Sequence, residues 1–314
     1  MTSKSLNSTL GYHFVAFLIV AIWGSTFVFT KMLLMAGLSP AQIFTLRFII
    51  AYVLLVGYEL CYKHFRFSSF HFFSASWRDE LLMALLGLSG GALYFLTENA
   101  ALIYTTATNT SLIVCSSPLF AMLLIALFYR QSEPLTRQKV TGSLIACAGM
   151  AVVVLNGHFV LHLSPLGDIL AFGACLCWAV YSLIMRNVTG RYSSLFITRK
   201  VFFYGVLTIL PYYFIVPSDN WIFTPSILQF FHLSTLLNLL FLAVVASMLC
   251  FLAWNWVISK LGAVVATNWV YFNPITTIIF AWWLLNEQIT PWFLLGTVLI
   301  LLGMYLCDKN SRKL

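Results

Sequence analysis

The chain has 314 residues, of which 61% are hydrophobic and only 8% are charged. Soluble domains carry about 25% charged residues, so this composition excludes a soluble protein, and the chain is too apolar to be disordered. The remaining class is an all-α integral membrane protein that crosses the bilayer several times. The net charge of +8 would suit a nucleic-acid-binding protein, but an excess of Lys and Arg in short loops is also typical of membrane proteins.

Ten apolar stretches, bounded by turn-forming or charged residues, are long enough to cross a bilayer, which takes about 20 residues as a helix. The N-terminal stretch is too long for the apolar part of a signal peptide, so we interpret it as a retained first span. We expect spans near residues 12–35, 40–61, 80–103, 106–128 and 138–156, and then near 165–186, 198–216, 234–258, 263–285 and 291–307.

The basic residues are distributed unevenly among the connecting loops. Of the 17 Lys and Arg residues, all but Lys31 and Arg47 lie before the first span, after the last, or around loops that follow an even-numbered span. Because cytoplasmic loops are enriched in Lys and Arg, we predict a multi-pass protein of the cell membrane with both termini in the cytoplasm. This distribution also explains the net charge without nucleic acid as a partner.

The sequence offers no catalytic or metal-binding motif. The seven cysteines fall in apolar stretches, the six histidines lack metal-ligand spacing, and no nucleotide-binding loop or nucleophile motif occurs. We therefore expect no cofactor, no metal and no enzymatic activity. The alternative is a membrane-embedded enzyme or lipid-modifying protein. It would need paired polar groups at one depth, and outside Glu98 and Arg47 the spans offer no such pair.

A duplication relates the two halves of the chain. Pro118 in the fourth span and Pro274 in the ninth are each preceded, 19 residues earlier, by an asparagine. Each proline is followed by the pattern Glu-x-x-Thr and then by two glycines seven residues apart. Since each half contains five spans, an odd number, the second must enter the membrane from the opposite side. We predict inverted five-helix repeats at 1–157 and 158–314, an arrangement found in many secondary transporters.

Several short motifs carry a family resemblance. Trp23-Gly24-Ser25-Thr26-Phe27 lies in the first span and Leu46-Arg47-Phe48 in the second, and Ala100, Leu102, Tyr104 and Thr105 precede the fourth. With the repeated Pro…Glu…Thr…Gly…Gly pattern, they resemble the EamA-type branch of the drug/metabolite transporter superfamily. The resemblance implies ten helices in two inverted repeats around a central cavity. It also implies transport of small metabolites, often outward: amino acids, drugs, sugars and related compounds.

Two charged residues within the spans, Glu98 and Arg47, are candidates for a functional role. Glu98 is expected toward the outer end of the third span, where a charge is costly and is a functional candidate by default. It would serve as a proton relay or as a counter-charge for a cationic substrate group; alternatively it reaches water or pairs with Arg47. Arg47 would bind a substrate carboxylate, but we favour a charge anchor that bonds free carbonyls or reaches outward.

Aromatic and amide side chains are the other candidates for a cavity lining, which suits a small amphipathic ligand. The alternative for each aromatic residue is packing or an interfacial belt. The prolines are expected to break their helices near mid-membrane, as gating points or as purely structural kinks. The predicted cavity comprises Trp23, Tyr94, Glu98, Asn99, Trp178, Asn255, Asn268, Trp269 and Asn273, with Pro118 and Pro274 as helix breaks and Arg47 as charge anchor.

These observations predict a secondary transporter, an exporter by family analogy, that moves small organic metabolites or drugs such as amino acids by alternating access. Its expected partners are a small-molecule substrate and the lipid bilayer. The sequence leaves proton coupling, the identity of the substrate and the oligomeric state open.

Overall fold

The computed structural model describes residues 3–66, 71–129, 136–155, 164–216, 232–285 and 291–308. Nearly all of them are helical, and within these ranges the only β-type pairing is an isolated bridge between Thr189 and Tyr192. Helices satisfy their own backbone hydrogen bonds, which is what a chain this apolar requires in lipid. The predicted all-α membrane class is confirmed.

The helices follow the expected order along the chain. The first half contains α1 (Ser3–Met35), α2 (Pro40–Arg66), α3 (Trp77–Gly87), the π-helical η1 (Leu88–Leu93), α4 (Tyr94–Tyr104), α5 (Ala107–Val114), α6 (Ser117–Phe128) and α7 (Arg137–Leu155). The second half contains α8 (Pro165–Val188), α9 (Ser194–Ile215), α11 (Leu233–Leu240), the π-helical η3 (Phe241–Leu249), α12 (Cys250–Leu261), α13 (Ala263–Asn268), the 3₁₀-helical η4 (Trp269–Phe272), α14 (Asn273–Leu285) and α15 (Pro291–Asp308).

Eight segments of the described chain are long and apolar enough to cross a membrane, and Leu294–Gly303 in α15 is a shorter apolar helix. The eight are Leu10–Met35, Pro40–Cys61, Trp77–Tyr104, Thr110–Phe128, Pro165–Val188, Ser194–Ile215, Leu233–Leu261 and Ala263–Leu284. Together with α7, these segments correspond to the ten predicted spans. The predicted repeat boundary, between residues 157 and 158, lies outside the described residues.

The irregular segments within the helices also recur at equivalent positions of the two halves. The third span, α3–η1–α4, and the eighth, α11–η3–α12, each contain a π-helical segment. The fourth and ninth spans are each broken in the middle. Their first parts begin at Ala107 and Ala263, and their second parts begin at Ser117 and Asn273, so both pairs are 156 residues apart. Pro118 and Pro274, the second residues of α6 and α14, share this spacing and explain the breaks.

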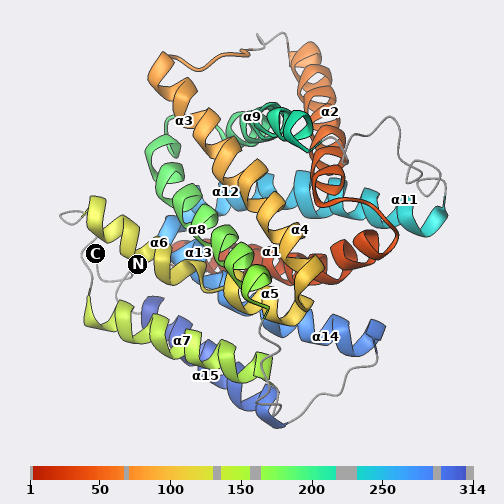
Figure 1. Ribbon diagram of the computed structural model, residues 1–314. Coiled ribbons are helices and arrows are strands. Elements are labelled where there is room, and N and C mark those ends of the chain that lie inside the picture. Colours follow the sequence, from red (N-terminus) through yellow and green to blue (C-terminus); the bar gives the residue numbers. More distant parts are fainter. Residues whose placement is uncertain are drawn as a thin grey trace.

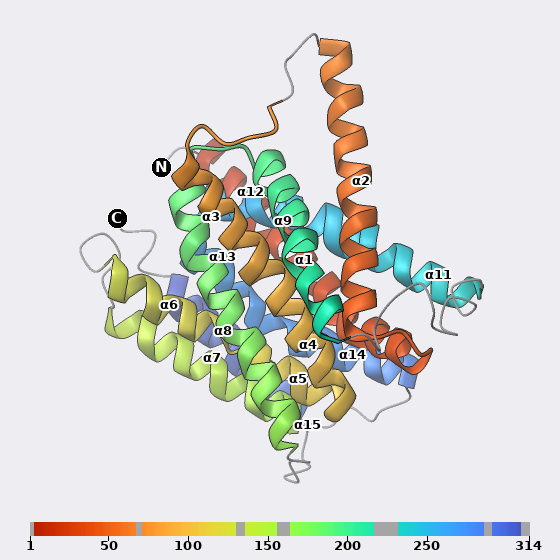
Figure 2. The same cartoon turned by 45° about the horizontal axis from the view of Figure 1, so that its top comes forward.

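The fifth and tenth spans form a pair at the edge of the bundle. Figures 1 and 2 both show α7 and α15 side by side. Glycines allow this close approach: a Cβ atom on Gly303 would lie 2.5 Å from the Gly142 carbonyl oxygen, and one on Gly149 would lie 2.8 Å from that of Gly296. The repeated glycines therefore serve helix packing.

Aromatic side chains fill the centre, where α1, α8 and α12 meet. Trp23 and Trp178, from the first and sixth spans, make an edge-to-face contact with ring centroids 5.4 Å apart. Trp254 lies 5.0 Å from Trp23 and is fully buried. Phe251 contacts both Trp23 and Trp178. This cluster joins the two halves of the chain and forms part of the wall described next.

Candidate functional site

A small pocket lies between the two halves. The space open to the centres of water molecules is about 30 Å³, room for about two waters, so the pocket is contracted in this conformation. It is lined by Trp23, Thr26, Phe27, Arg47, Tyr94, Phe95, Glu98, Val114, Ser117, Trp178, Phe251, Val270 and Asn273.

The helix breaks bring equivalent positions of the two halves to this pocket. Val114 ends α5, and its equivalent Val270 lies in η4, just before the second part of the ninth span. Ser117 begins α6 and Asn273 begins α14. All four line the pocket, which therefore lies at the interface of the two repeats, where secondary transporters hold their substrates.

Six of the predicted functional residues line this one pocket. They are Trp23, Arg47, Tyr94, Glu98, Trp178 and Asn273. Pro118 and Pro274 directly follow the lining residues Ser117 and Asn273. The remaining four predicted residues lie outside the pocket, and their side chains have other roles.

The two asparagines related by the repeat are used internally. Asn255 accepts a hydrogen bond from the Tyr181 hydroxyl at 2.6 Å and donates one to the Thr198 hydroxyl at 2.8 Å. Asn99 donates to the Pro40 carbonyl at 3.1 Å. Both side chains are almost fully buried away from the pocket, because buried amides need partners and neighbouring helices supply them.

Asn268 and Trp269 lie at the break of the ninth span. Asn268 is buried at the end of α13 and does not line the pocket. The Trp269 indole donates to His13 Nδ1 at 3.1 Å and lines a separate apolar groove with Phe14 and Phe17 of α1. Trp269, the first residue of the 3₁₀-helical η4, therefore lines this groove and not the central pocket, which the sequence pattern does not reveal.

Sequence reasoning missed seven of the lining residues, which are Thr26, Phe27, Phe95, Val114, Ser117, Phe251 and Val270. Two signals point to some of them. Thr26 and Phe27 belong to the same first-span motif as Trp23. Ser117 is the repeat equivalent of the predicted Asn273, at the same 156-residue spacing as Pro118 and Pro274.

The surrounding protein satisfies only some of the hydrogen-bond donors of Arg47. Its side chain is 1% exposed, its Nε donates to the Ser247 hydroxyl, and its guanidinium lies over the Phe95 ring with Cζ 4.5 Å from the centroid. The Nη1 atom is buried and has no hydrogen-bond partner. The protein therefore fixes the Nε atom of Arg47, while its Nη1 atom remains free to donate a hydrogen bond.

Glu98 lies in the same pocket without pairing with Arg47. It is 6% exposed, and its Oε1 accepts a hydrogen bond from the Tyr94 hydroxyl at 2.9 Å. Among the described residues no ion pair within 4 Å joins Glu98 to Arg47 or to any other base. The expected alternative, a direct pair between these two residues, is not formed in this conformation.

Three further polar atoms of the lining have no hydrogen-bond partner: Trp178 Nε1, Ser117 Oγ and Asn273 Oδ1. By contrast, Trp23 Nε1 donates to the Ala246 carbonyl at 2.9 Å. Elsewhere in the described chain, buried atoms of this kind include Ser74 Oγ, Asn99 Oδ1 and Trp254 Nε1. Buried polar groups are normally satisfied, so their concentration around one pocket makes this pocket the candidate binding site.

A second group of buried charges lies at one end of the bundle, and we call it the ion-pair cluster. Arg199 pairs with Glu59 at 2.6 Å and Lys200 with Glu80 at 2.5 Å. Arg191 pairs with Asp79 at 2.7 Å. The acids all come from α2 and α3 of the first half, and the bases from α9 and the turn before it. The cluster therefore ties the two halves together.

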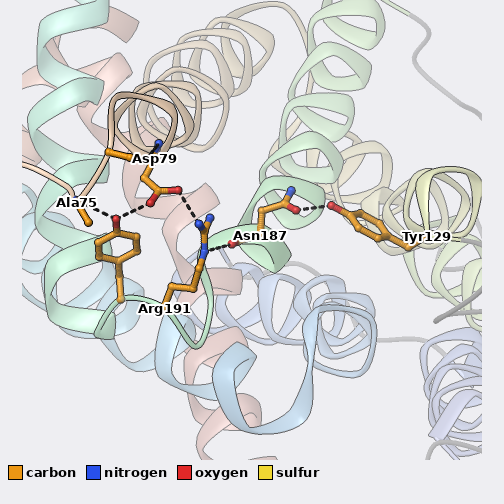
Figure 3. Close-up of polar contacts among 7 residues, drawn as sticks. Ala75, Asp79, Tyr129, Asn187 and Arg191 are labelled. Atoms are coloured by element: carbon orange, nitrogen blue, oxygen red, sulfur yellow. Dashed lines mark hydrogen bonds and ion pairs between the residues drawn. The ribbon is translucent and has the colours of Figure 1, made fainter.

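Figure 3 shows further polar contacts at the same end of the molecule as the ion-pair cluster. Asp79 also accepts a hydrogen bond from the Tyr192 hydroxyl at 2.7 Å, and Arg191 Nε donates to the Asn187 carbonyl at 2.8 Å. The Asn187 side chain in turn accepts from the Tyr129 hydroxyl, directly after α6. The polar network thus passes repeatedly between the halves. In the sequence, the bases of this network appear only as topology signals, and nothing marks the acids that pair with them.

Comparisons with known proteins agree with this architecture. A crystal structure of a protein that is 17% identical superposes with a TM-score of 0.71, covering 97% of this chain and 99% of the other, which shows the fold alone. An "Uncharacterized transporter" of Archaeoglobus fulgidus is 26% identical over 96% of this chain and 98% of its own.

Two further relatives have more specific names. The "Probable amino-acid metabolite efflux pump" of Salmonella typhimurium is 26% identical, covering 93% of both chains. The "Probable terminal-alkyne amino-acid exporter" of Streptantibioticus cattleyicolor is 24% identical, covering 74% of this chain and 75% of its own. The model of the EamA-like transporter family matches twice, at residues 10–155 and 165–307. The chain therefore belongs to the EamA-like transporter family, and it is a multi-pass membrane transporter.

Proposed function

We propose that this protein is a secondary transporter that exports small organic metabolites or drugs by alternating access, with the central pocket as its substrate site. The observation that carries the proposal is the position of the pocket. It lies where the broken fourth and ninth spans meet, and equivalent residues of both repeats line it. Discontinuous helices at a repeat interface are a recurring substrate site in secondary transporters.

The contracted state of the pocket supports a mechanism in which the two repeats move. Space for about two waters is too small for an organic metabolite, so substrate entry requires the walls to separate. The ion-pair cluster joins the repeats at the end that the basic loops predict to be cytoplasmic. Loading from that side would require Glu59–Arg199 and Glu80–Lys200 to separate, so the cluster would act as the inner gate.

Glu98 is the residue through which we propose proton coupling. It is a buried carboxylate in the pocket wall, with one hydrogen bond from Tyr94. Protonation would remove a charge whose burial is costly and would change the attraction of the pocket for a cationic group. Binding of a proton and of a cationic substrate group at Glu98 would then compete.

Reconstitution into liposomes tests the function. The purified chain should move members of a panel of amino acids and organic cations without ATP, and flux should respond to an imposed pH gradient. Protein-free liposomes are the control. Absence of flux for every compound, or flux that depends on ATP, would contradict the proposal. The first result would favour the alternative of a membrane-embedded enzyme or lipid-modifying protein.

The proposed membrane orientation has its own test. In a background without native cysteines, Ser259→Cys, at the exposed end of α12, should react with a membrane-impermeant maleimide only after the cells are opened. Leu161→Cys should react in intact cells, because the basic loops predict that position 161 is outside and position 259 inside. The reverse pattern would overturn the predicted cytoplasmic termini and the localisation of the ion-pair cluster.

A further inference from the structure

A short irregular segment beside the ion-pair cluster reaches from the first half of the chain onto the second. It comprises residues 71–76, which lead into α3 and which we call the strap. The His71 carbonyl accepts a hydrogen bond from Arg199 Nη2 of α9, and the Ala75 amide donates one to the Tyr192 hydroxyl at 3.0 Å (Figure 3). The backbone of the strap therefore fastens the two halves to each other.

Side chains and backbone of the strap also enclose one ion pair of the cluster. The Lys200 ammonium lies 4.5 Å from the centre of the Phe72 ring and 5.2 Å from that of Phe73. Its partner Glu80 accepts a hydrogen bond from the Ser74 amide at 2.7 Å. Lys200 is 1% exposed and Glu80 7%, whereas Phe73 is 72% exposed. The strap therefore forms a layer between these charges and the surrounding water.

The exclusion of water determines how strongly an ion pair holds two helices together. Parting the charges of a pair in a dry site leaves each without compensation and changes an equilibrium constant by more than about 100-fold. Parting an exposed pair changes it by less than about fivefold, because water solvates both charges. Lifting of the strap would turn the Glu80–Lys200 pair from the first kind into the second.

On the basis of the proposed function, in which the cluster is the inner gate, we propose that the strap locks this gate by excluding water from its ion pairs. Opening then has a fixed order. The strap lifts first, water reaches the charges, and only then do α3 and α9 part. The strap is suited to move first, because it forms no helix and part of it is exposed, and such segments open at the lowest cost.

Reversible fastening of the strap tests this order. Ala75 and Tyr192 are both replaced by cysteine in a background without native cysteines, because the strap already meets the second half of the chain at these residues. In proteoliposomes, a short bis-methanethiosulfonate reagent that joins the two cysteines should lower transport at least about tenfold relative to the untreated variant, as expected for an element that must open in each cycle. A reductant should restore transport.

A monofunctional methanethiosulfonate is the matched control, since it modifies both cysteines without joining them and should leave transport near the untreated rate. Mass spectrometry of the intact protein measures the joined fraction. Transport that continues in the joined protein overturns the proposal, because the gate would then open beneath a fastened strap. Cysteines that the reagent does not join, or equal loss of transport with the monofunctional reagent, overturn it as well.

Unfolding in detergent tests the exclusion of water without any transport. Glu80→Gln should lower the folding equilibrium constant at least about tenfold less in the Phe72→Ala background than in the wild type, because water then reaches the Lys200 ammonium that loses its partner. Phe214→Ala is the matched control, because Phe214 is 86% exposed in α9, and it should leave the effect of Glu80→Gln unchanged. The same effect in all three backgrounds overturns the proposal. Phe72→Leu replaces the alanine variant if that variant does not fold.

The outcomes keep this inference apart from the proposed function. If the untreated protein transports and joining the cysteines has no effect, the transport function stands and the lock is overturned. If no compound moves in any sample, the proposed function fails, and the unfolding measurements alone decide on the strap. A smaller effect of Glu80→Gln in the Phe72→Ala background then supports a cover that excludes water, and an unchanged effect overturns it.

Discussion

The molecule buries charges in two places, and the two are built differently. In the ion-pair cluster, Glu59 and Glu80 each have a base within 2.6 Å, and the Lys200 ammonium also lies 4.5 Å from the centre of the Phe72 ring. In the central pocket, Arg47 and Glu98 remain apart, and donors and acceptors around them lack partners. Both sites join the same two repeats.

We interpret the ion-pair cluster as a contact that holds a conformation, and the central pocket as the proposed substrate site. Paired charges lose little by staying buried, whereas removal of one partner is costly. Unpaired groups destabilise the protein on their own and gain only when something binds. We therefore expect substitutions in the cluster to change stability first, and those in the pocket to change ligand binding first.

The largest effect on stability should come from breaking a pair in the cluster. Lys200→Gln leaves Glu80 buried with uncharged hydrogen-bond partners, which include the Tyr204 hydroxyl and the Ser74 amide. We expect a loss on the order of 3 kcal/mol, as for other buried pairs that lose one partner. Unfolding in detergent measures it. The double variant with Glu80→Gln should lose less than the sum of the singles; strict additivity would show that the pair is not coupled.

Glycines at the two sites allow a matched test of packing. A Cβ atom at Gly87, near the cluster, would lie 2.5 Å from Tyr204 Cβ, and one at Gly24, near the pocket, would lie 2.7 Å from the Asn273 carbonyl oxygen. Overpacking costs about 1–3 kcal/mol, so both alanine variants should be less stable. Only Gly24→Ala should also lower transport in liposomes, because it displaces Asn273. Equal effects on transport would contradict the separation of the two sites.

Neutralising the pocket acid should barely change stability. Glu98→Gln removes an unpaired buried charge and keeps an acceptor for Tyr94, so we expect the free energy of unfolding to change by less than about 1 kcal/mol or to rise. Transport should fall and lose its pH dependence. Unchanged pH dependence in liposomes would exclude Glu98 from proton coupling.

The smallest effect is expected at the exposed edge of the cluster. The Arg191 side chain is 51% exposed, so its pair with Asp79 is screened by water. Arg191→Gln should shift the melting temperature much less than Lys200→Gln does, and transport should persist. A shift as large as that of Lys200→Gln would mean that the whole network shown in Figure 3 unfolds as one unit.

Some features followed from the sequence alone because they depend on composition and local pattern. Apolar stretches of span length predict helices whatever their neighbours. Pro118 and Pro274 break their helices for a local reason, the missing N–H. The repeated spacings and short motifs identified the EamA-like family, which the family match confirms. The placement of cytoplasmic termini and the boundary at residues 157 and 158 stay predictions.

Other features depend on which side chains meet across the bundle, and only the tertiary structure decided them. Asn99 and Asn255 look like cavity residues, but neighbouring helices use their amides. Arg199 and Lys200 look like loop charges, but acids of the first repeat pair with them. Arg47 and Glu98 could each be recognised as unusual in the sequence. That they share a pocket without pairing depends on distances between helices, which local patterns do not encode.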